Sequence, residues 1–148
     1  MLCISTRGQS PAIPLHQAII EGIAPDGGLY LPERIPQINL AALLASETYQ
    51  QAALQAMSPF FVDDLLAEKL PAMIERAFDF PTPLKSLNTK NDFLLELFHG
   101  PTSAFKDVGA RFLAECFAAV PAKNKTRTIL VATSGDTGGA VAAAFHQH

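Results

Sequence analysis

The second half of the sequence alternates short apolar runs with longer amphipathic stretches, and this alternation restricts the fold more than any other feature. Residues 93–98 are apolar except for Glu96, and residues 126–133 form a second run. Between them, apolar residues recur at the i, i+3, i+7 spacing of one helix face. They are Phe105, Val108, Phe112, Leu113, Cys116, Phe117 and Val120. With a further helix predicted from Thr137 onward, the order strand, helix, strand, helix predicts an α/β fold with a buried parallel sheet.

The first half of the sequence has helical periodicity instead. A short helix is predicted over Leu15–Gly22, because glycine favours the left-handed end of a helix. A longer helix is predicted over residues 40–57, with Asn39 accepting a hydrogen bond from a first-turn amide. A third is predicted over residues 63–78, where the interior Pro71 is expected to kink or divide it.

Two prolines in the segment Asp79–Pro83 mark the change between these patterns. We therefore predict an N-terminal, mainly helical domain over residues 1–79 and the first part of an α/β domain over residues 80–148. Two parallel strands do not make a stable sheet, so the sequence is expected to be the front part of a longer protein. Exposed sheet edges and apolar helix faces are expected to favour self-association.

Composition and charge exclude several kinds of partner. The net charge is −3 and the 11 Lys and Arg residues are scattered, which argues against a nucleic-acid-binding face. The apolar runs are shorter than the ~20 residues that cross a bilayer, and the N-terminus lacks a signal-peptide block. Cys3 and Cys116 have no metal-ligand spacing. We predict a cytoplasmic protein that binds a small molecule, without metal, membrane or nucleic acid.

The glycine-rich segment 134–139, between the second apolar run and the last helix, is one candidate site. Amide groups at a helix start, with the positive end of the helix dipole, bind carboxylate or phosphate. The spacing matches neither the dinucleotide-binding glycine motif nor a P-loop. From the residues alone, an anion site and a merely structural tight turn remain equally open.

Lys106 is the second candidate, in the first turn of the amphipathic helix and next to Phe105. The helix dipole and burial both favour its neutral, nucleophilic amine, which a Schiff base requires. A solvated surface lysine paired with Asp107 or another acid is the alternative. His99 could act as an acid or base or be a hydrogen-bonded structural residue, and Glu96 could tune a site or be paired.

Four segments carry a resemblance to a known family. Residues 96–107 read Glu-Leu-Phe-His-Gly-Pro-Thr-Ser-Ala-Phe-Lys-Asp, and residues 132–141 read Ala-Thr-Ser-Gly-Asp-Thr-Gly-Gly-Ala-Val. Near the N-terminus stand Ser-Thr-Arg-Gly at residues 5–8 and Ala-Pro-Asp-Gly-Gly-Leu-Tyr-Leu-Pro at residues 24–32. In this order they closely resemble the threonine synthases, which are pyridoxal-phosphate (PLP) enzymes of fold type II. Cysteine synthases and threonine dehydratases are not expected to share the N-terminal segments.

The resemblance implies that Lys106 forms the Schiff base with PLP and that Phe105 lies against the cofactor. It also implies that one loop binds the substrate's carboxylate. That loop consists of Ser134, Gly135, Asp136, Thr137 and Gly138. Asp136 is expected to point away from the bound carboxylate and to cap the helix or bond to backbone, because two carboxylates repel each other. Arg7 is a further candidate for phosphate binding.

The reaction that the resemblance implies converts O-phospho-L-homoserine and water to L-threonine and phosphate. The family's binding loop for the cofactor phosphate is expected beyond residue 148, so the chain alone is expected to be inactive and to need the remainder of the longer protein. Two alternatives remain open: a PLP-dependent serine or threonine dehydratase, and a non-catalytic module that retains only the fold.

Overall fold

The computed structural model describes residues 1–121 and 127–146, which form parts of two compact units. The first unit contains Met1–Ile74 and Cys116–Pro121; the second contains Glu75–Glu115 and the described part of Ala122–His148. Helices α4 (Leu70–Ala77) and α5 (Lys106–Ala119) contribute residues to both units. In the described residues, no helix combines the length and the apolar character needed to cross a membrane.

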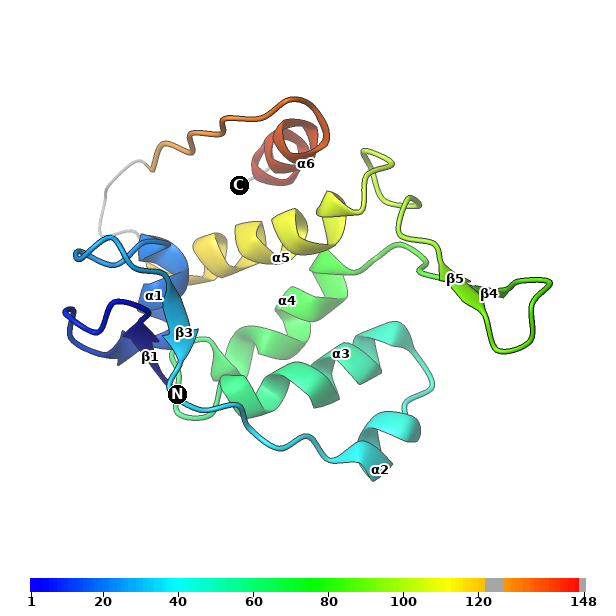
Figure 1. Cartoon of the computed structure of the whole chain (residues 1–148), viewed down its shortest axis with the longest axis horizontal. Helices are drawn as coiled ribbons and strands as arrows, with labels where there is room; N and C mark the ends of the chain where they lie inside the picture. Colours follow the sequence, from blue (N-terminus) through cyan, green and yellow to red (C-terminus); the bar gives the residue numbers. More distant parts are fainter. Residues whose placement is uncertain (122–126, 147–148) are drawn as a thin grey trace. The chain divides into compact units, whose positions relative to one another are not determined.

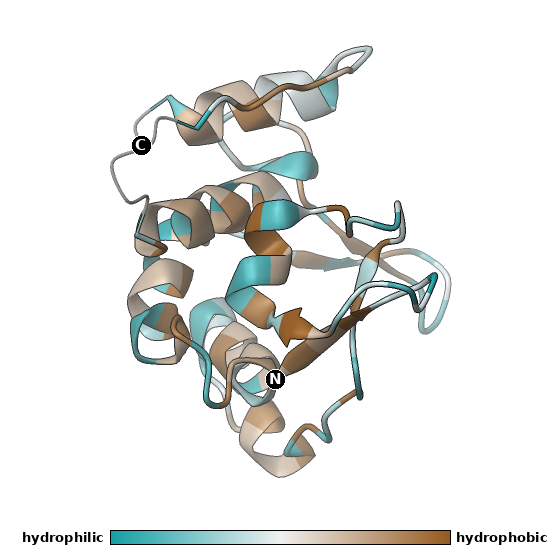
Figure 2. Cartoon of the chain, turned by 90° about the vertical axis from the view of Figure 1, so that its left-hand side faces the viewer, coloured by the Kyte–Doolittle hydropathy of each residue, from teal (hydrophilic) through white to brown (hydrophobic). Residues whose placement is uncertain are grey.

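A small antiparallel sheet organises the first unit. Its central strand β1 (Leu2–Ser5) pairs with β2 (Ile13–Pro14) on one side and β3 (Tyr30–Pro32) on the other. Figure 2 shows hydrophobic residues along the strands beside the N-terminus. Buried Cys3 of β1 packs against Ile13 of β2 and against Ala18 of the helix that follows β2. This sheet was not predicted, because strands of four, two and three residues are too short to show a clear alternation.

The short helices of the first unit follow the sequence only in part. Helix α1 (Leu15–Glu21) ends at Gly22 with φ 70°, which confirms the predicted left-handed end. The predicted 40–57 helix is wrong as a single element, because it is divided into α2 (Leu40–Leu44) and α3 (Tyr49–Met57). Thr48 causes the division, since its side chain accepts a hydrogen bond from the Gln51 amide and starts a new helix.

The third predicted helix begins later than expected. The 3-10 turns η1 (Ser58–Phe60) and η2 (Ala67–Lys69) precede α4, which starts at Leu70. Buried Asp64 accepts a hydrogen bond from the Leu66 amide at 3.0 Å and so closes a turn where the helix was predicted to start. Pro71 is the second residue of α4 and does not kink it, because first-turn amides have no acceptor within the helix.

The second unit begins with a β-hairpin. Strand β4 (Leu84–Ser86) pairs antiparallel with β5 (Phe93–Leu95), and both strands are exposed. Figure 1 shows the hairpin standing apart from helices α5 and α6 (Asp136–Phe145). The prediction of a buried strand over 93–98 is therefore wrong in its length, burial and pairing.

The second predicted strand is not formed either. Thr126 lies outside the described residues. Residues 127–133 have no strand pairing, and residues 128–133 are exposed, with Leu130 at 90%. All strand pairs in the described part of the chain are antiparallel. The hairpin forms because its strands are neighbours in sequence, whereas a parallel pair needs a long crossover connection.

Small residues hold α5 and α6 together. Ala110 and Ala114 of α5 pack against Ala140 and Ala144 of α6, and Val141 and Phe145 lie against this cluster. Of the apolar residues predicted to face the core, Cys116 is fully buried, whereas two of the large ones are exposed. Phe105 is 56% exposed and Leu113 is 37% exposed. The close helix contact selects the alanine face of α5 instead, because small side chains let two helices approach.

Candidate functional site

Lys106 is the first residue of α5, and its side chain is half-buried. Its Nζ lies 4.6 Å from the centroid of the Phe105 ring, within the range of a cation–π contact. The structure describes no carboxylate bonded to this amine. The alternative of an ion pair with Asp107 is wrong, because the Asp107 carboxylate is bonded to Thr102 instead.

An apolar cavity of about 440 Å³ lies beside Lys106. Residues of the 93–107 segment, of α5 and of α6 line it. They are Leu97, Phe105, Lys106, Val108, Gly109, Ala110, Leu113, Thr137 and Val141. A Cβ atom added to Gly109 would have no neighbour within 4 Å, so this wall is open. The cavity thus brings together residues of the segments 96–107 and 132–141, and its walls are apolar apart from Lys106 and Thr137.

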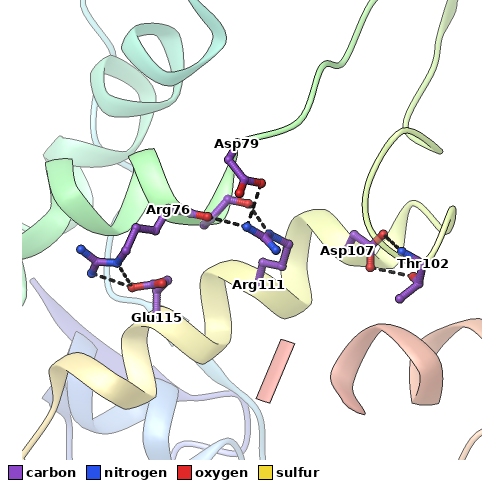
Figure 3. A network of polar contacts seen from close by, with 7 residues as sticks. Arg76, Asp79, Thr102, Asp107, Arg111 and Glu115 are labelled. Atoms are coloured by element: carbon purple, nitrogen blue, oxygen red, sulfur yellow. Dashed lines mark hydrogen bonds and ion pairs between the residues drawn. The ribbon is translucent and has the colours of Figure 1, made fainter. Parts of the chain in front are cut away.

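The loop that leads into α5 is fastened by the residue after the lysine. Asp107 is 1% exposed; its Oδ2 accepts a hydrogen bond from the Thr102 amide at 2.8 Å, and its Oδ1 accepts one from Thr102 Oγ1 at 2.7 Å (Figure 3). Gly100 lies against the same carboxylate, and a Cβ atom there would come within 2.8 Å of the Asp107 Cβ. This role of Asp107 was not predicted from the sequence.

Two arginines join the end of α4 to α5 within this unit. The Glu115 carboxylate, which accepts hydrogen bonds from Arg76 Nε at 2.9 Å and Nη2 at 2.7 Å, raises the pKa of the Arg76 guanidinium. Arg111 donates to the Ala77 carbonyl at 2.9 Å and to Asp79 at 2.8 Å (Figure 3). These bonds connect the end of α4 to the middle of α5, one turn or more beyond Lys106.

Glu96 and His99 pair with one another. His99 Nε2 lies 2.8 Å from Glu96 Oε2, and the imidazole stacks on the Phe98 ring with centroids 4.6 Å apart. The contact with His99 gives a reason for the presence of Glu96 in an otherwise apolar run. Neither side chain lines the cavity beside Lys106.

A threonine hydroxyl, two residues before the N-cap Gly135, holds the start of helix α6. Thr133 Oγ1 accepts hydrogen bonds from the amides of Gly135 at 3.1 Å and Gly138 at 3.2 Å. A Cβ atom on Gly138 would overlap the Thr133 side chain, so this position requires glycine. The expectation that Asp136 caps the helix is wrong: it is the first helical residue and makes no cap bond. Thr133 stands directly before the glycine-rich segment 134–139, and a threonine just ahead of a helix start is the sequence signal that could have indicated its hydrogen bonds to the amides there.

The predicted loop is therefore only partly assembled around the cavity. Thr137 lines the cavity beside Lys106, whereas Ser134, Gly135 and Asp136 are exposed and do not line it. Gly138 lines a different hollow, beside residues 129–133. The N–H groups of Asp136 and Thr137 have no acceptor in the described part of the chain, which leaves two first-turn donors for an anion.

The N-terminal motifs bind one another in the first unit. Asp26 accepts hydrogen bonds from Ser5 Oγ at 2.7 Å, the Gly28 amide at 2.8 Å and the Gln9 amide at 3.0 Å. The bond from Ser5, followed by those from the two amides, lowers the pKa of the Asp26 carboxyl to about 2. Arg7 Nη1 donates to the Asp26 carbonyl at 2.8 Å. The motif residues therefore close a loop.

Comparisons with known proteins agree on one family. The model described as "Threonine synthase N terminus" matches residues 3–78. The threonine synthase of Haemophilus influenzae is 44% identical over 134 residues, which are 90% of this chain and 31% of that protein. The threonine synthase of Escherichia coli is 36% identical over 149 residues, covering 99% of this chain and 34% of the relative.

Solved structures give the same result. The crystal structure of PLP-bound threonine synthase from Brucella melitensis matches with a TM-score of 0.87 and 39% identity, covering 98% of this chain and 33% of that one. The yeast threonine synthase structure matches with a TM-score of 0.81 and 36% identity, covering 97% of this chain and 33% of that one. The chain thus spans about a third of the length of the relatives that it matches.

Proposed function

Because the chain belongs to the threonine synthase family, we propose that it forms the lysine-bearing part of a PLP enzyme that converts O-phospho-L-homoserine and water to L-threonine and phosphate. Family membership confirms the predicted resemblance and the predicted fold class, the front part of an α/β enzyme. The observation that carries the proposal is that Lys106 lines an apolar cavity that is also lined by Thr137, from the segment 132–141.

The described residues fit the amine-binding end of the cofactor. A cavity of about 440 Å³ lies within the roughly 300–1,000 Å³ of small-molecule sites. Its walls are apolar apart from Lys106 and Thr137, which suits a flat aromatic ring. When bound, PLP takes up the electrons released as substrate C–H bonds break. Lys106 would hold the cofactor through its Nζ and carry protons at that atom, with Phe105 against the ring.

The start of α6 supplies the proposed substrate end of the site. The N–H groups of Asp136 and Thr137, at the positive end of the helix dipole, are suited to the substrate's carboxylate. We assign the loop from Ser134 to Gly138 to this contact, and its exposure leaves it accessible to a ligand. The Thr133 hydroxyl holds two of the loop's other amides, so it would shape the loop rather than bind substrate.

The division into domains at residues 79 and 80, the cytoplasmic location and self-association remain predictions. We further propose that these 148 residues alone do not turn over substrate, because only two sides of the site are present in them. Polypeptide corresponding to the other two thirds of the relatives would complete the site. Phosphate release from O-phospho-L-homoserine by the purified chain would contradict this part of the proposal.

Covalent labelling of Lys106 tests the proposed function. The purified chain is mixed with PLP and reduced with borohydride, and the modified lysine is then located by peptide mass. We expect label at Lys106 in preference to Lys69, Lys85 and Lys90, and its loss in Lys106→Arg. Lys85→Arg, in the exposed hairpin, is the matched control and should label like the wild type.

The other outcomes separate the alternatives. Label spread evenly over the lysines, or a folded chain that ignores PLP, would contradict the proposal and favour a non-catalytic module. If Lys106 is labelled but the protein completed with the remaining polypeptide turns over serine or threonine instead of O-phospho-L-homoserine, the dehydratase alternative is correct.

A further inference from the structure

We propose that Asp107 is a positioning residue for Lys106: by binding Thr102, its carboxylate fixes the loop that leads into α5 and so determines where the lysine's side chain begins. The inference rests on the proposed function only for the use of the amine. The positioning itself concerns contacts within this chain.

The Asp107 carboxylate is buried and is used entirely within the loop. Both of its oxygens accept hydrogen bonds from Thr102, one from the amide at 2.8 Å and one from the hydroxyl at 2.7 Å. The Asp107 amide donates to the Ala104 carbonyl at 3.0 Å. Asp107 therefore holds the loop at two points, one through its side chain and one through its backbone.

The loop has a conformation that needs such support. Ser103 has a backbone φ of 56°, a left-handed conformation that residues other than glycine rarely adopt. The Ser103 amide donates to the Gly100 carbonyl at 3.1 Å, which closes a tight turn just ahead of the helix. Without the carboxylate, the partly buried Thr102 amide would lose its acceptor, and the turn would be free to relax toward more favourable backbone angles.

The position of Asp107 in the helix makes this support act on the lysine. Consecutive helical residues project about 100° apart, so Asp107 faces the loop while Lys106 reaches the cavity. A shift of the loop displaces the first turn of α5, which includes Lys106. Gly100 limits the replacement of Asp107 by a longer residue, because it already lies in contact with the carboxylate.

Substitutions of Asp107 and Thr102 separate positioning from simple stability. Asp107→Ala removes both hydrogen bonds, whereas Thr102→Val removes only the one from the hydroxyl. In Asp107→Asn, the amide oxygen can accept from the Thr102 amide and the NH₂ group can donate to the Thr102 hydroxyl, so this variant should behave as a rescue. Asp64→Ala is the matched control, because buried Asp64 also accepts two amide bonds, from His16 and Leu66, in the first unit.

Two readouts follow the position of the amine. Trace acetylation with acetic anhydride gives the rate at Lys106 relative to exposed Lys85 in the same sample, and PLP with borohydride gives covalent label at Lys106. In the wild type, half-buried Lys106 should acetylate more slowly than Lys85. In Asp107→Ala the ratio should approach one and PLP label should fall about tenfold or more, since a displacement of about 1 Å can cost on the order of 100-fold.

The outcomes decide between the two proposals. An unchanged acetylation ratio in folded Asp107→Ala and Thr102→Val would overturn the positioning role, and so would an equal change in Asp64→Ala. If Asp107→Ala does not fold, Thr102→Val and Asp107→Asn provide the test. If the wild type takes up no PLP label at Lys106, the proposed function fails, and the acetylation ratios still decide the role of Asp107.

Discussion

The two helices that form the proposed site begin in different ways. The loop before α5 is closed by a buried carboxylate, Asp107, which accepts two hydrogen bonds from Thr102. The loop before α6 is exposed and is closed by a neutral hydroxyl, that of Thr133. Hydrogen bonds to a charged group contribute about 1.5–3 kcal/mol and neutral ones about 0.5–1.5 kcal/mol. The first loop is therefore held more firmly than the second.

This difference matches the roles proposed for the two loops. A residue that holds a cofactor covalently needs a fixed position before the cofactor arrives, and the chain provides it for Lys106. A loop that binds and releases substrate needs donors that remain accessible, and the amides of Asp136 and Thr137 meet this need. On the proposed assignment, this chain fixes the lysine side of the site through Asp107 and leaves the donors on the substrate side open to a ligand.

The largest expected effect comes from adding one methyl group to each loop. Gly100→Ala places a Cβ atom against the Asp107 carboxylate and should lower the free energy of unfolding by about 1–3 kcal/mol. Gly135→Ala meets no atom within 4 Å and should change it by less than about 0.5 kcal/mol. Urea unfolding measures both. Equal losses in the two variants would show that the loops do not differ as described.

A smaller effect is expected from the hydroxyl cap of α6. Thr133→Val removes the acceptor of the Gly135 and Gly138 amides and should cost about 1 kcal/mol, the usual loss for a helix N-cap. Thr133→Ser keeps the hydroxyl and is the control. The measurement is the urea midpoint at constant slope. A loss as large as that of Gly100→Ala would mean that the second loop is held as firmly as the first.

Local signals in the sequence predicted some elements well. The glycine at the end of α1, the Asn39 cap of α2 and the long helix α5 all follow from residue types at fixed spacings. The division between α2 and α3 was missed, although Thr48 and Gln51 have the spacing of a helix start. The small sheet of the first unit was not predictable, since its pairing depends on contacts between distant short strands.

The site was predictable in its residues but not in its geometry. The motifs indicated Lys106 and the loop before α6, and the structure brings Lys106 and Thr137 to one cavity. The sequence did not indicate that Asp107 would bind Thr102, because both the lysine and the aspartate could have faced solvent. The periodicity of α5 indicated the buried Cys116, but it did not indicate Ala110 and Ala114, because the spacing rule favours large apolar residues and the contact with α6 selects alanines.

Gly109, on the cavity side of α5, tests how open the wall of the proposed site is. Gly109 has no neighbour within 4 Å of an added Cβ atom, so Gly109→Ala should raise the free energy of unfolding by about 0.5–1 kcal/mol through helix propensity. Gly109→Leu should fill the cavity and reduce PLP label at Lys106 without unfolding the chain. Thermal unfolding and the labelling assay measure the two effects. Destabilisation by alanine would show that this wall is more crowded than the structure describes.

The smallest effect is expected at Asp26, a carboxylate that closes a loop of the first unit. It tests whether a loop held by a charged group loses stability in acid. The Asp26 pKa is lowered from 3.8 to about 2, mainly by the Ser5 hydrogen bond. Because the folded-state pKa is the lower one, its contribution to stability is complete above pH 3.8 and is lost as the pH falls through about 2. The unfolding midpoint should therefore fall over this range by more in the wild type than in Asp26→Asn.

Thr133→Val should retain the wild-type pH dependence, because a hydroxyl does not titrate there. Parallel curves for the wild type and Asp26→Asn would show that this carboxylate does not hold its loop, and charge alone would then not explain the firmer loop before α5.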